Sequence, residues 1–360
     1  MTIKSPIPLL YESDYYFLLS VVKSRELTVL KKEDFVKILK SRDISEAISS
    51  ITTSHIGNYI SGKIPSSPTP EDIGKTIDDY LNSEYTFIIE KSPKVISRFV
   101  STFLWKHDLI NIIGKITELI LEIKYRAISK GIIHQLGFLD LLVRASNVDE
   151  IIDLLNKCRL RTFSQVIYYN KELITTRKEE NIYLIEHLLY NAYVSELLRQ
   201  ARWFTDTNLI TWIKRYIDLL NIKLVLKNII LNIPRHIARN MFIDEGAYIP
   251  IHELQEAINY SNTGQVISWL RSTPYIHLAE KLNNLLTATK DILSSMDLAI
   301  NAYALKILSE SPTSSPISPQ PILRYIVLKE VESHLLRLVL NSVLKNVNKD
   351  VMEKIVNELM

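Results

Sequence analysis

A short motif that occurs three times constrains the fold of this 360-residue chain more than any other feature. Each copy sets an acidic residue among leucines and isoleucines, and the copies lie at residues 104–113, 215–222 and 329–340. The acidic positions are Asp108, Asp218 and Glu332, so neighbouring copies are 110 and 114 residues apart. Helical solenoids repeat every ~30–50 residues. The longer period therefore predicts three copies of one larger structural unit.

A tyrosine precedes the acidic residue in every copy. These residues are Tyr85, Tyr193 and Tyr303, and they lie 23, 25 and 29 residues before the acidic position. The longest gap belongs to the third copy, where a loop rich in serine and proline, residues 311–321, interrupts the helical pattern. Two landmarks in the same order support a true internal repeat.

Few residues in this chain break helices. The chain has 8 glycines, and no proline lies between Pro93 and Pro234. Hydrophobic residues make up 47% and charged residues 23%, which is enough apolar material for a sizeable core. A long stretch of leucine, isoleucine, lysine and glutamate without breakers favours helix, whereas a sheet needs frequent turns. We therefore predict an all-α fold.

The repeat predicts three helical domains. Their expected bounds are residues 1–130, 138–243 and 246–360. Thr69 before Pro70 predicts a helix start, because threonine caps helix N-termini and proline suits the first turn. Asn147 predicts another start. The helix that carries Asp108 is expected to continue to about Lys130, followed by a boundary at 131–137.

Two of the motifs combine an aspartate with an asparagine three residues later. Asp108 and Asn111, like Asp218 and Asn221, share one face of a helix. Both residue types are poor interior helix formers, so their placement suggests a tertiary role. We expect them to bond the backbone of a loop or a neighbouring helix within each domain, and direct contact with a partner is the alternative. The third copy has only Glu332.

Composition argues against several classes of protein. A net charge of +3 does not provide the dense basic face of a nucleic-acid-binding protein. The single cysteine, Cys158, rules out an internal disulfide framework and a multi-cysteine metal site, and we expect it to be a buried thiol. The most apolar stretch, residues 217–233, contains three charged residues, so we expect no membrane-spanning helix and no signal peptide.

Catalytic signatures are also missing from the sequence. No phosphate-binding Gly-x-x-x-x-Gly-Lys-Ser/Thr segment and no Gly-x-Ser-x-Gly elbow occurs. His252 and Glu253 begin like a zinc-protease motif that lacks its second histidine. We therefore assign no catalytic, cofactor-binding or metal-binding residue, and expect no small-molecule substrate.

Several segments resemble the C subunit of archaeal A-type ATP synthases, the counterpart of the vacuolar ATPase d subunit. They are residues 23–28 with Asp34 and Phe35, the Thr-Pro-Tyr stop at 273–275, and the segments 216–223, 321–325, 329–332 and 336–340. The resemblance spans the chain, although the first copy is divergent. Leu335 stands where the family tends to carry asparagine, so the third motif has lost its amide.

The resemblance implies an all-α funnel of three similar helical domains with pseudo-threefold symmetry. It implies a non-catalytic central-rotor socket that links the central stalk to the membrane proteolipid ring. Such a protein transmits rotation that couples proton or sodium transport to ATP synthesis or hydrolysis. It sits peripherally on the cytoplasmic side of the membrane, held by protein partners. The alternative is a generic α-helical adaptor in another soluble assembly, with a chance likeness of helical repeats.

Overall fold

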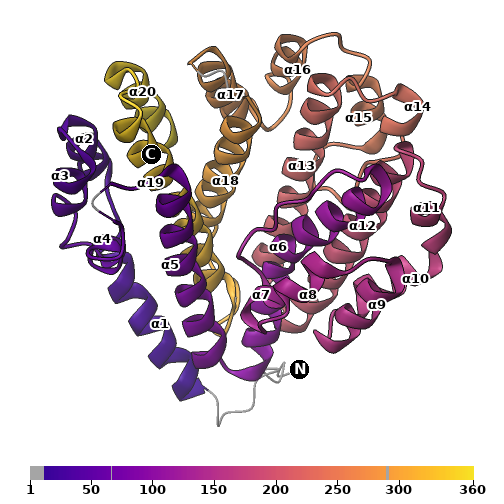
Figure 1. Cartoon of the computed structure of the whole chain (residues 1–360), viewed down its shortest axis with the longest axis horizontal. Helices are drawn as coiled ribbons and strands as arrows, with labels where there is room; N and C mark the ends of the chain where they lie inside the picture. Colours follow the sequence, from indigo (N-terminus) through magenta and orange to yellow (C-terminus); the bar gives the residue numbers. More distant parts are fainter. Residues whose placement is uncertain (1–11, 66, 289–291) are drawn as a thin grey trace. The chain divides into compact units, whose positions relative to one another are not determined.

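The computed structural model describes residues 12–65, 67–288 and 292–360. These residues form helices and connecting loops, and no β-strand occurs among them (Figure 1). The all-α prediction is therefore confirmed. Within the described ranges we find no helix that combines the length and the apolar character needed to cross a membrane.

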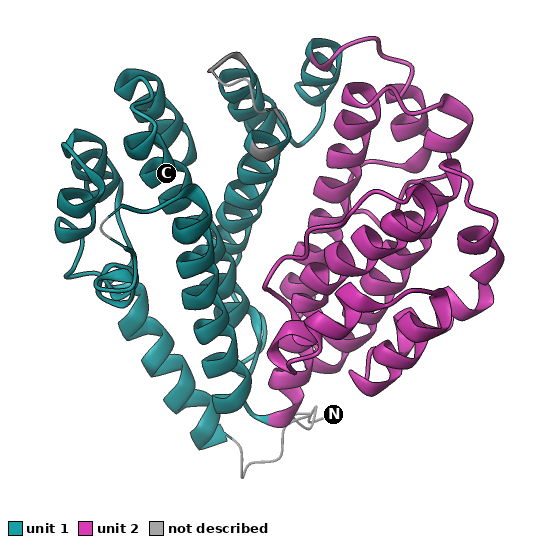
Figure 2. Ribbon diagram, in the orientation of Figure 1, with its two compact units in different colours: residues 1–93, 264–360 teal, residues 94–263 magenta. Residues whose placement is uncertain are grey.

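Contacts between Cα atoms divide the chain into two compact units (Figure 2). Unit 1 combines both ends of the chain, residues 1–93 and 264–360, and unit 2 is the continuous segment 94–263. The first of our three predicted domains thus contributes helices to both units. The division into three repeat domains stays a prediction.

In unit 1, the long helix α19 is the central element. It packs along α5 and α18 and also contacts α1 and α2. Its buried face carries large apolar side chains such as Ile322, Leu336 and Val339. The helices of this unit are α1 (Glu12–Glu26), α2 (Lys32–Lys40), α3 (Ile44–Ser49), α4 (His55–Ile60), α5 (Pro70–Lys91), α16 (Thr263–Leu270), α17 (Ile276–Ala288), α18 (Ile292–Glu310), α19 (Gln320–Leu344) and α20 (Lys349–Leu359).

Unit 2 is built around the pairing of α6 with α12, and α12 also contacts α13. An aromatic cluster fills part of its core, where Trp212 stacks on Tyr216 and both rings lie near Phe103. The helices are α6 (Lys94–Leu121), α7 (Ile132–Gln135), α8 (Leu139–Arg144), α9 (Val148–Lys157), α10 (Arg161–Tyr169), α11 (Lys171–Thr175), α12 (Glu180–Ala201), the 3₁₀ helix η2 (Arg202–Phe204), α13 (Thr207–Ile230), α14 (Arg235–Ala238) and α15 (Ile251–Ala257).

The predicted helix starts are confirmed. Thr69 caps α5: its hydroxyl accepts the Asp72 N–H at 3.2 Å, and the Asp72 carboxylate accepts the Thr69 N–H at 2.8 Å. The Asn147 carbonyl oxygen accepts the Glu150 N–H at 3.0 Å at the start of α9. Each cap satisfies backbone donors that have no partner inside the helix.

The predicted end of the first long helix is wrong. Helix α6 stops at Leu121, nine residues before Lys130, and Glu122 adopts a left-handed φ of 58°. The chain then doubles back along α6, and the Tyr125 ring lies directly over Gly114, where a Cβ atom would overlap it. Side-chain hydrogen bonds from α6 hold this return segment in place. These bonds, and not local helix propensity, decide its conformation.

Candidate functional site: three loop clamps and a buried polar network

The Asp108 carboxylate binds the first backbone N–H groups of α7, where the loop that leads out of α6 ends. Its two oxygens accept the N–H groups of Ile132 and Ile133, each at 2.9 Å. The preceding residue, Gly131, has φ +94° and lies so close that a Cβ atom would overlap the carboxylate. Asp108 is fully buried, and burial raises its pKa to about 7 despite the two N–H donors.

Asn111, one turn further along α6, binds the same loop through both sides of its amide. Its carbonyl oxygen accepts the Ile128 N–H at 2.9 Å, and its amino group donates to the Ile128 carbonyl at 3.0 Å. The Tyr125 hydroxyl donates to the same carbonyl oxygen of Asn111. We call Asp108, Asn111 and their loop the first loop clamp.

The second loop clamp repeats this chemistry on α13. One Asp218 oxygen accepts the N–H groups of Ala247 and Tyr248, at 3.1 and 2.8 Å. The Asn221 amide pairs with both backbone groups of Ile243, each bond being 2.8 Å long. Both side chains are buried. As at Gly131 in the first clamp, a Cβ on the glycine before the bound amides, Gly246, would overlap the aspartate carboxylate.

The third loop clamp, in unit 1, differs. One Glu332 oxygen accepts the Leu30 N–H at 2.8 Å, and the other accepts the Lys329 ammonium at 2.8 Å. Both charged side chains are at most 1% exposed. Leu335 occupies the position of the missing amide and is buried. Burial raises the pKa of Glu332, and the lysine opposes that shift.

Two of the three landmark tyrosines hydrogen-bond the motif helix of another copy. The Tyr85 hydroxyl on α5 donates to Glu330 on α19 at 2.8 Å, within unit 1. The Tyr193 hydroxyl on α12 donates to the Phe103 carbonyl on α6 at 3.1 Å, within unit 2. Tyr303 is 4% exposed and packs edge-to-face on Tyr275, with ring centroids 6.1 Å apart. All three tyrosines lie in the core.

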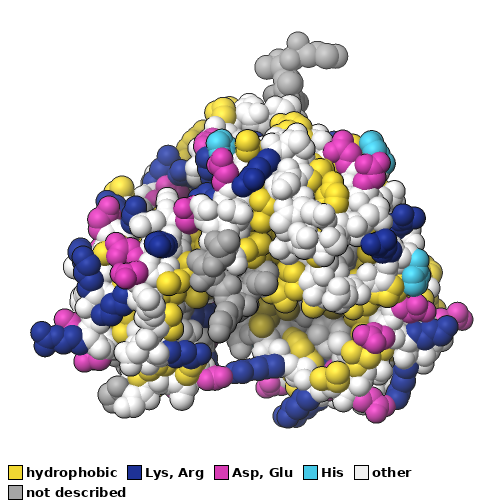
Figure 3. Space-filling model, turned by 90° about the horizontal axis from the view of Figure 1, so that it is seen from above, with side chains coloured by type: hydrophobic (Ala, Val, Ile, Leu, Met, Phe, Trp, Pro, Cys, Tyr) yellow, Lys and Arg dark blue, Asp and Glu magenta, His cyan; other side chains and the backbone are white. Residues whose placement is uncertain are grey.

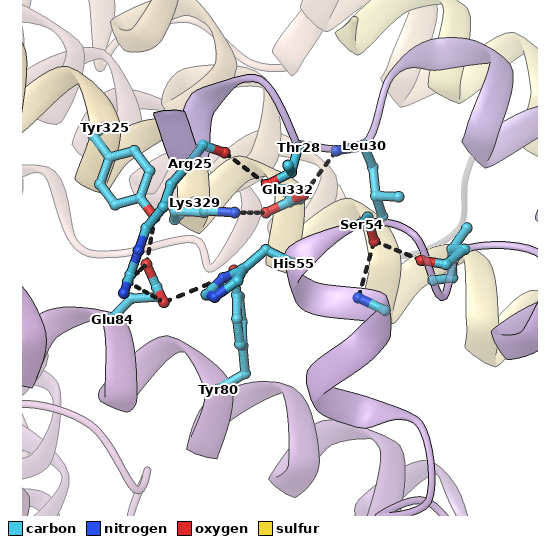
Figure 4. A network of polar contacts seen from close by, with 12 residues as sticks. Arg25, Thr28, Leu30, Ser54, His55, Tyr80, Glu84, Tyr325, Lys329 and Glu332 are labelled. Carbon is cyan, nitrogen blue, oxygen red and sulfur yellow. Dashed lines mark hydrogen bonds and ion pairs between the residues drawn. The ribbon is translucent and has the colours of Figure 1, made fainter. Parts of the chain in front are cut away.

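A polar network continues from the third clamp through unit 1 (Figure 4). Glu84 on α5 is 3% exposed and accepts Arg25 of α1 at 2.9 and 3.0 Å, together with the Tyr325 hydroxyl of α19. His55 of α4 lies 3.4 Å from Glu84 and 3.1 Å from the Tyr80 hydroxyl. The network thereby ties α1 and α4 to α5 and α19.

Aromatic rings shield the ammonium at the centre of this network. The Lys329 Nζ atom lies 5.4 Å from the Tyr80 ring centroid and 5.7 Å from that of Tyr325. Burial lowers the pKa of His55, although the Glu84 carboxylate opposes the shift. Cationic side chains thus alternate with carboxylates and phenol rings, an arrangement that compensates buried charge.

Sequence reasoning missed the buried lysines. Lys115 on α6 is 3% exposed and donates to the Val143 carbonyl at 2.8 Å and to Glu118 at 3.0 Å. Lys329 has the same signal in the sequence: a lysine in line with the apolar face of a long helix. Such a lysine must find a partner when it is buried.

Among the described residues, no group of three or more histidine, cysteine, aspartate or glutamate side chains could hold a metal ion. His252 is exposed on α15. Cys158 is 3% exposed, and burial raises the pKa of its thiol to about 11, so the thiolate is disfavoured. The buried-thiol interpretation is confirmed.

Comparisons with known proteins identify the family of this chain. The A-type ATP synthase C subunit of Thermococcus kodakarensis is 23% identical over 345 residues, covering 94% of this chain and 89% of that protein. The A-type ATP synthase C subunit of Pyrococcus furiosus is 20% identical, covering 94% of this chain and 89% of that protein. That of Archaeoglobus fulgidus is 24% identical, covering 88% of each chain. The sequence profile of the ATP synthase (C/AC39) subunit family matches residues 18–355, and the chain therefore belongs to that family.

Proposed function

We propose that this chain is the central-rotor socket of an A-type or V-type ATP synthase, joining the central stalk to the membrane proteolipid ring. In that role it transmits rotation on the cytoplasmic side of the membrane and has no catalytic activity of its own. The observation that carries the proposal is the family match from residue 18 to residue 355 of an all-helical chain.

The helices have the stiffness that a torque-bearing spacer needs. Helix α6 has 28 residues and α13 has 24, so they are struts of ~42 and ~36 Å at about 1.5 Å per residue. The loop clamps fix the segments that leave these helices to the helix surface. A force on such a loop is transmitted to the long helix through buried hydrogen bonds, because these bonds keep the loop from moving independently.

The surface charges fit protein partners better than nucleic acid. Lysine and arginine side chains are interspersed with aspartate and glutamate over the face drawn in Figure 3. A nucleic-acid footprint gathers cations along one face or stripe. The proposed partners are accordingly the stalk proteins and the proteolipid ring.

Co-purification tests the proposal directly. The tagged chain is expressed with the other ATP synthase subunits of its genome and recovered in mild detergent. We expect a stalk protein and a small proteolipid to remain bound, and no ATP hydrolysis by the chain alone. Recovery of unrelated soluble proteins, without stalk or proteolipid at any salt concentration, would contradict the proposal and favour the helical adaptor.

A charge reversal locates the contacts. We expect partner binding at helix ends and loops, where exposed residues such as Arg159 and Arg161 lie between α9 and α10. The double variant Arg159→Glu/Arg161→Glu should weaken recovery of a partner. The matched control is Lys354→Glu, an exposed residue in the middle of α20. Equal recovery of both variants would count against contacts at this helix end.

A further inference from the structure

A pocket of about 280 Å³ lies in unit 2 where α13 ends. Its walls come from the last turn of α13, from α14 and from the segment after α15. The lining is mixed: Ile229, Ile233, Pro234, Ala238 and Ile258 are apolar, whereas Asn228, Asn232, Arg235, Tyr260 and Ser261 carry polar groups. The volume is slightly below the ~300–1,000 Å³ of typical small-molecule sites. It suits a short stretch of polypeptide.

The side chain of Asn228, in this wall, has no hydrogen-bond partner in the described part of the chain. Asn228 is 4% exposed, and neither its carbonyl oxygen nor its amino group has a hydrogen-bond partner among the described residues. A buried polar group without a partner is unfavourable, and such groups are rare in folded proteins. Asn228 lines the pocket, and the carboxamide torsion of asparagine is soft.

The same helix shows what this amide would bind. Asn221 lies seven residues before Asn228, two turns away on the same face. Its amide pairs with the N–H and the carbonyl of one residue, Ile243. Asn111 pairs with Ile128 in the same way. Both satisfied clamp amides therefore hold the backbone N–H and carbonyl of one residue, through an acceptor and a donor.

The first clamp also shows a backbone segment at the position equivalent to Asn228. Glu118 follows Asp108 by ten residues, as Asn228 follows Asp218, and its carboxylate accepts the Tyr125 N–H at 3.1 Å. In the first copy the chain doubles back past this position. In the second copy the chain enters α14 (Arg235–Ala238) soon after α13, and no described backbone group bonds the Asn228 side chain.

We propose that this pocket binds an extended, acidic segment of a neighbouring protein in the complex, with the backbone N–H and carbonyl of one of its residues paired to the Asn228 amide. Arg235 supplies the reason for the acidic character: it is exposed at the rim and has no ion pair among the residues described. The identification of the neighbour as part of the ATP synthase rests on the proposed function.

Two leucine substitutions on α13 separate binding from folding. In the isolated chain, Asn228→Leu should leave the melting temperature unchanged or raise it, because an unpartnered amide becomes apolar. Asn221→Leu is the matched control and should lower it by about 5 °C, since Ile243 loses both partners. In the complex, Asn228→Leu should weaken binding of the neighbouring protein about tenfold. A melting temperature that falls as in Asn221→Leu, or unchanged binding, would overturn the inference.

Photo-crosslinking identifies the occupant. Tyr260, in the pocket wall, is replaced by p-benzoylphenylalanine in the co-expressed complex, and the crosslinked peptide is mapped by mass spectrometry. We expect one acidic segment of another protein of the complex, with at least fivefold less crosslink in the Asn228→Leu background. A complex that assembles without this crosslink refutes the pocket alone, as expected if only water occupies it. Failure to assemble with stalk or ring refutes the proposed function, and this inference with it.

Discussion

In unit 2, the buried carboxylates of the first and second loop clamps are each held by two backbone N–H groups. In unit 1, Glu332 of the third loop clamp accepts one N–H group and a buried ammonium. The asparagine of the other clamps is replaced there by Leu335. The difference shows two ways to keep an acid inside a helical core: with two backbone N–H donors, or with one N–H donor and a buried ammonium.

Removing the ammonium should have the largest effect. Lys329→Met leaves Glu332 buried with a single donor, so we expect the free energy of unfolding to fall by about 3–5 kcal/mol. Urea titration followed by circular dichroism measures the change. The double variant Lys329→Met/Glu332→Gln should recover part of the loss. A single variant within about 1 kcal/mol of the native chain would mean that the ion pair does not sustain the clamp.

The first clamp should respond to pH. The pKa of Asp108 is raised from 3.8 to about 7 on folding. The stabilisation that this residue gives the fold is therefore complete below the unfolded pKa and is lost as pH rises through the folded pKa. The native chain should therefore lose up to about 4 kcal/mol relative to Asp108→Asn between pH 4 and pH 8. Asn111→Leu removes a clamp residue that does not titrate. The difference in unfolding free energy between this variant and the native chain should therefore not change with pH. Parallel pH curves for native and Asp108→Asn would contradict the assignment.

Glycine substitutions compare steric fit in the two clamps of unit 2. Gly131→Ala combines a left-handed φ with overlap of the Asp108 carboxylate, and should cost about 3 kcal/mol. Gly246→Ala meets the Asp218 carboxylate without an unfavourable φ and should cost less. Gly137→Ala isolates the backbone effect, at about 1 kcal/mol, since nothing lies near its Cβ position at φ +76°. Thermal unfolding should rank the three in this order, and a harmless Gly131→Ala would show that the loop can move away.

The smallest difference in stability loss is expected between Tyr85 and Tyr193, the two landmark tyrosines that donate hydrogen bonds. Tyr85→Phe removes a hydrogen bond to the Glu330 carboxylate and should cost about 2 kcal/mol. Tyr193→Phe removes one to a neutral carbonyl, that of Phe103, and should cost about 1 kcal/mol. Chemical denaturation of both variants tests the order. A larger loss for Tyr193→Phe would show that the charge of the acceptor does not decide the cost.

Local signals in the sequence predicted much of the helical structure. The caps at Thr69 and Asn147 formed as expected, because capping depends on residues within one turn. The pairing of aspartate with asparagine also indicated loop binding, and in both complete copies these side chains bond loop backbone. The loss of the amide in the third copy was visible in Leu335.

Contacts between distant segments were beyond the reach of the sequence. Residues 122–130 contain no glycine or proline and have the composition of a helix, yet bonds from Asn111 hold them in a returning loop. Likewise, no pattern linked Leu30 to Glu332, which lie 302 residues apart in the chain. The sequence also did not predict that Lys329 would neutralise the Glu332 carboxylate. Tertiary hydrogen bonds decided these features against local propensity.

The pairing of the first helices with α19 has a consequence for biosynthesis. A ribosome releases residues 12–93 early, but their partners on α19 (Gln320–Leu344) emerge last. Unit 2 is continuous in sequence and lies between them, so it can fold while unit 1 waits. During that interval the apolar faces of α1 and α5 have no cover from α19. Synthesis of α19 is therefore the step that covers these faces and ends the aggregation-prone interval.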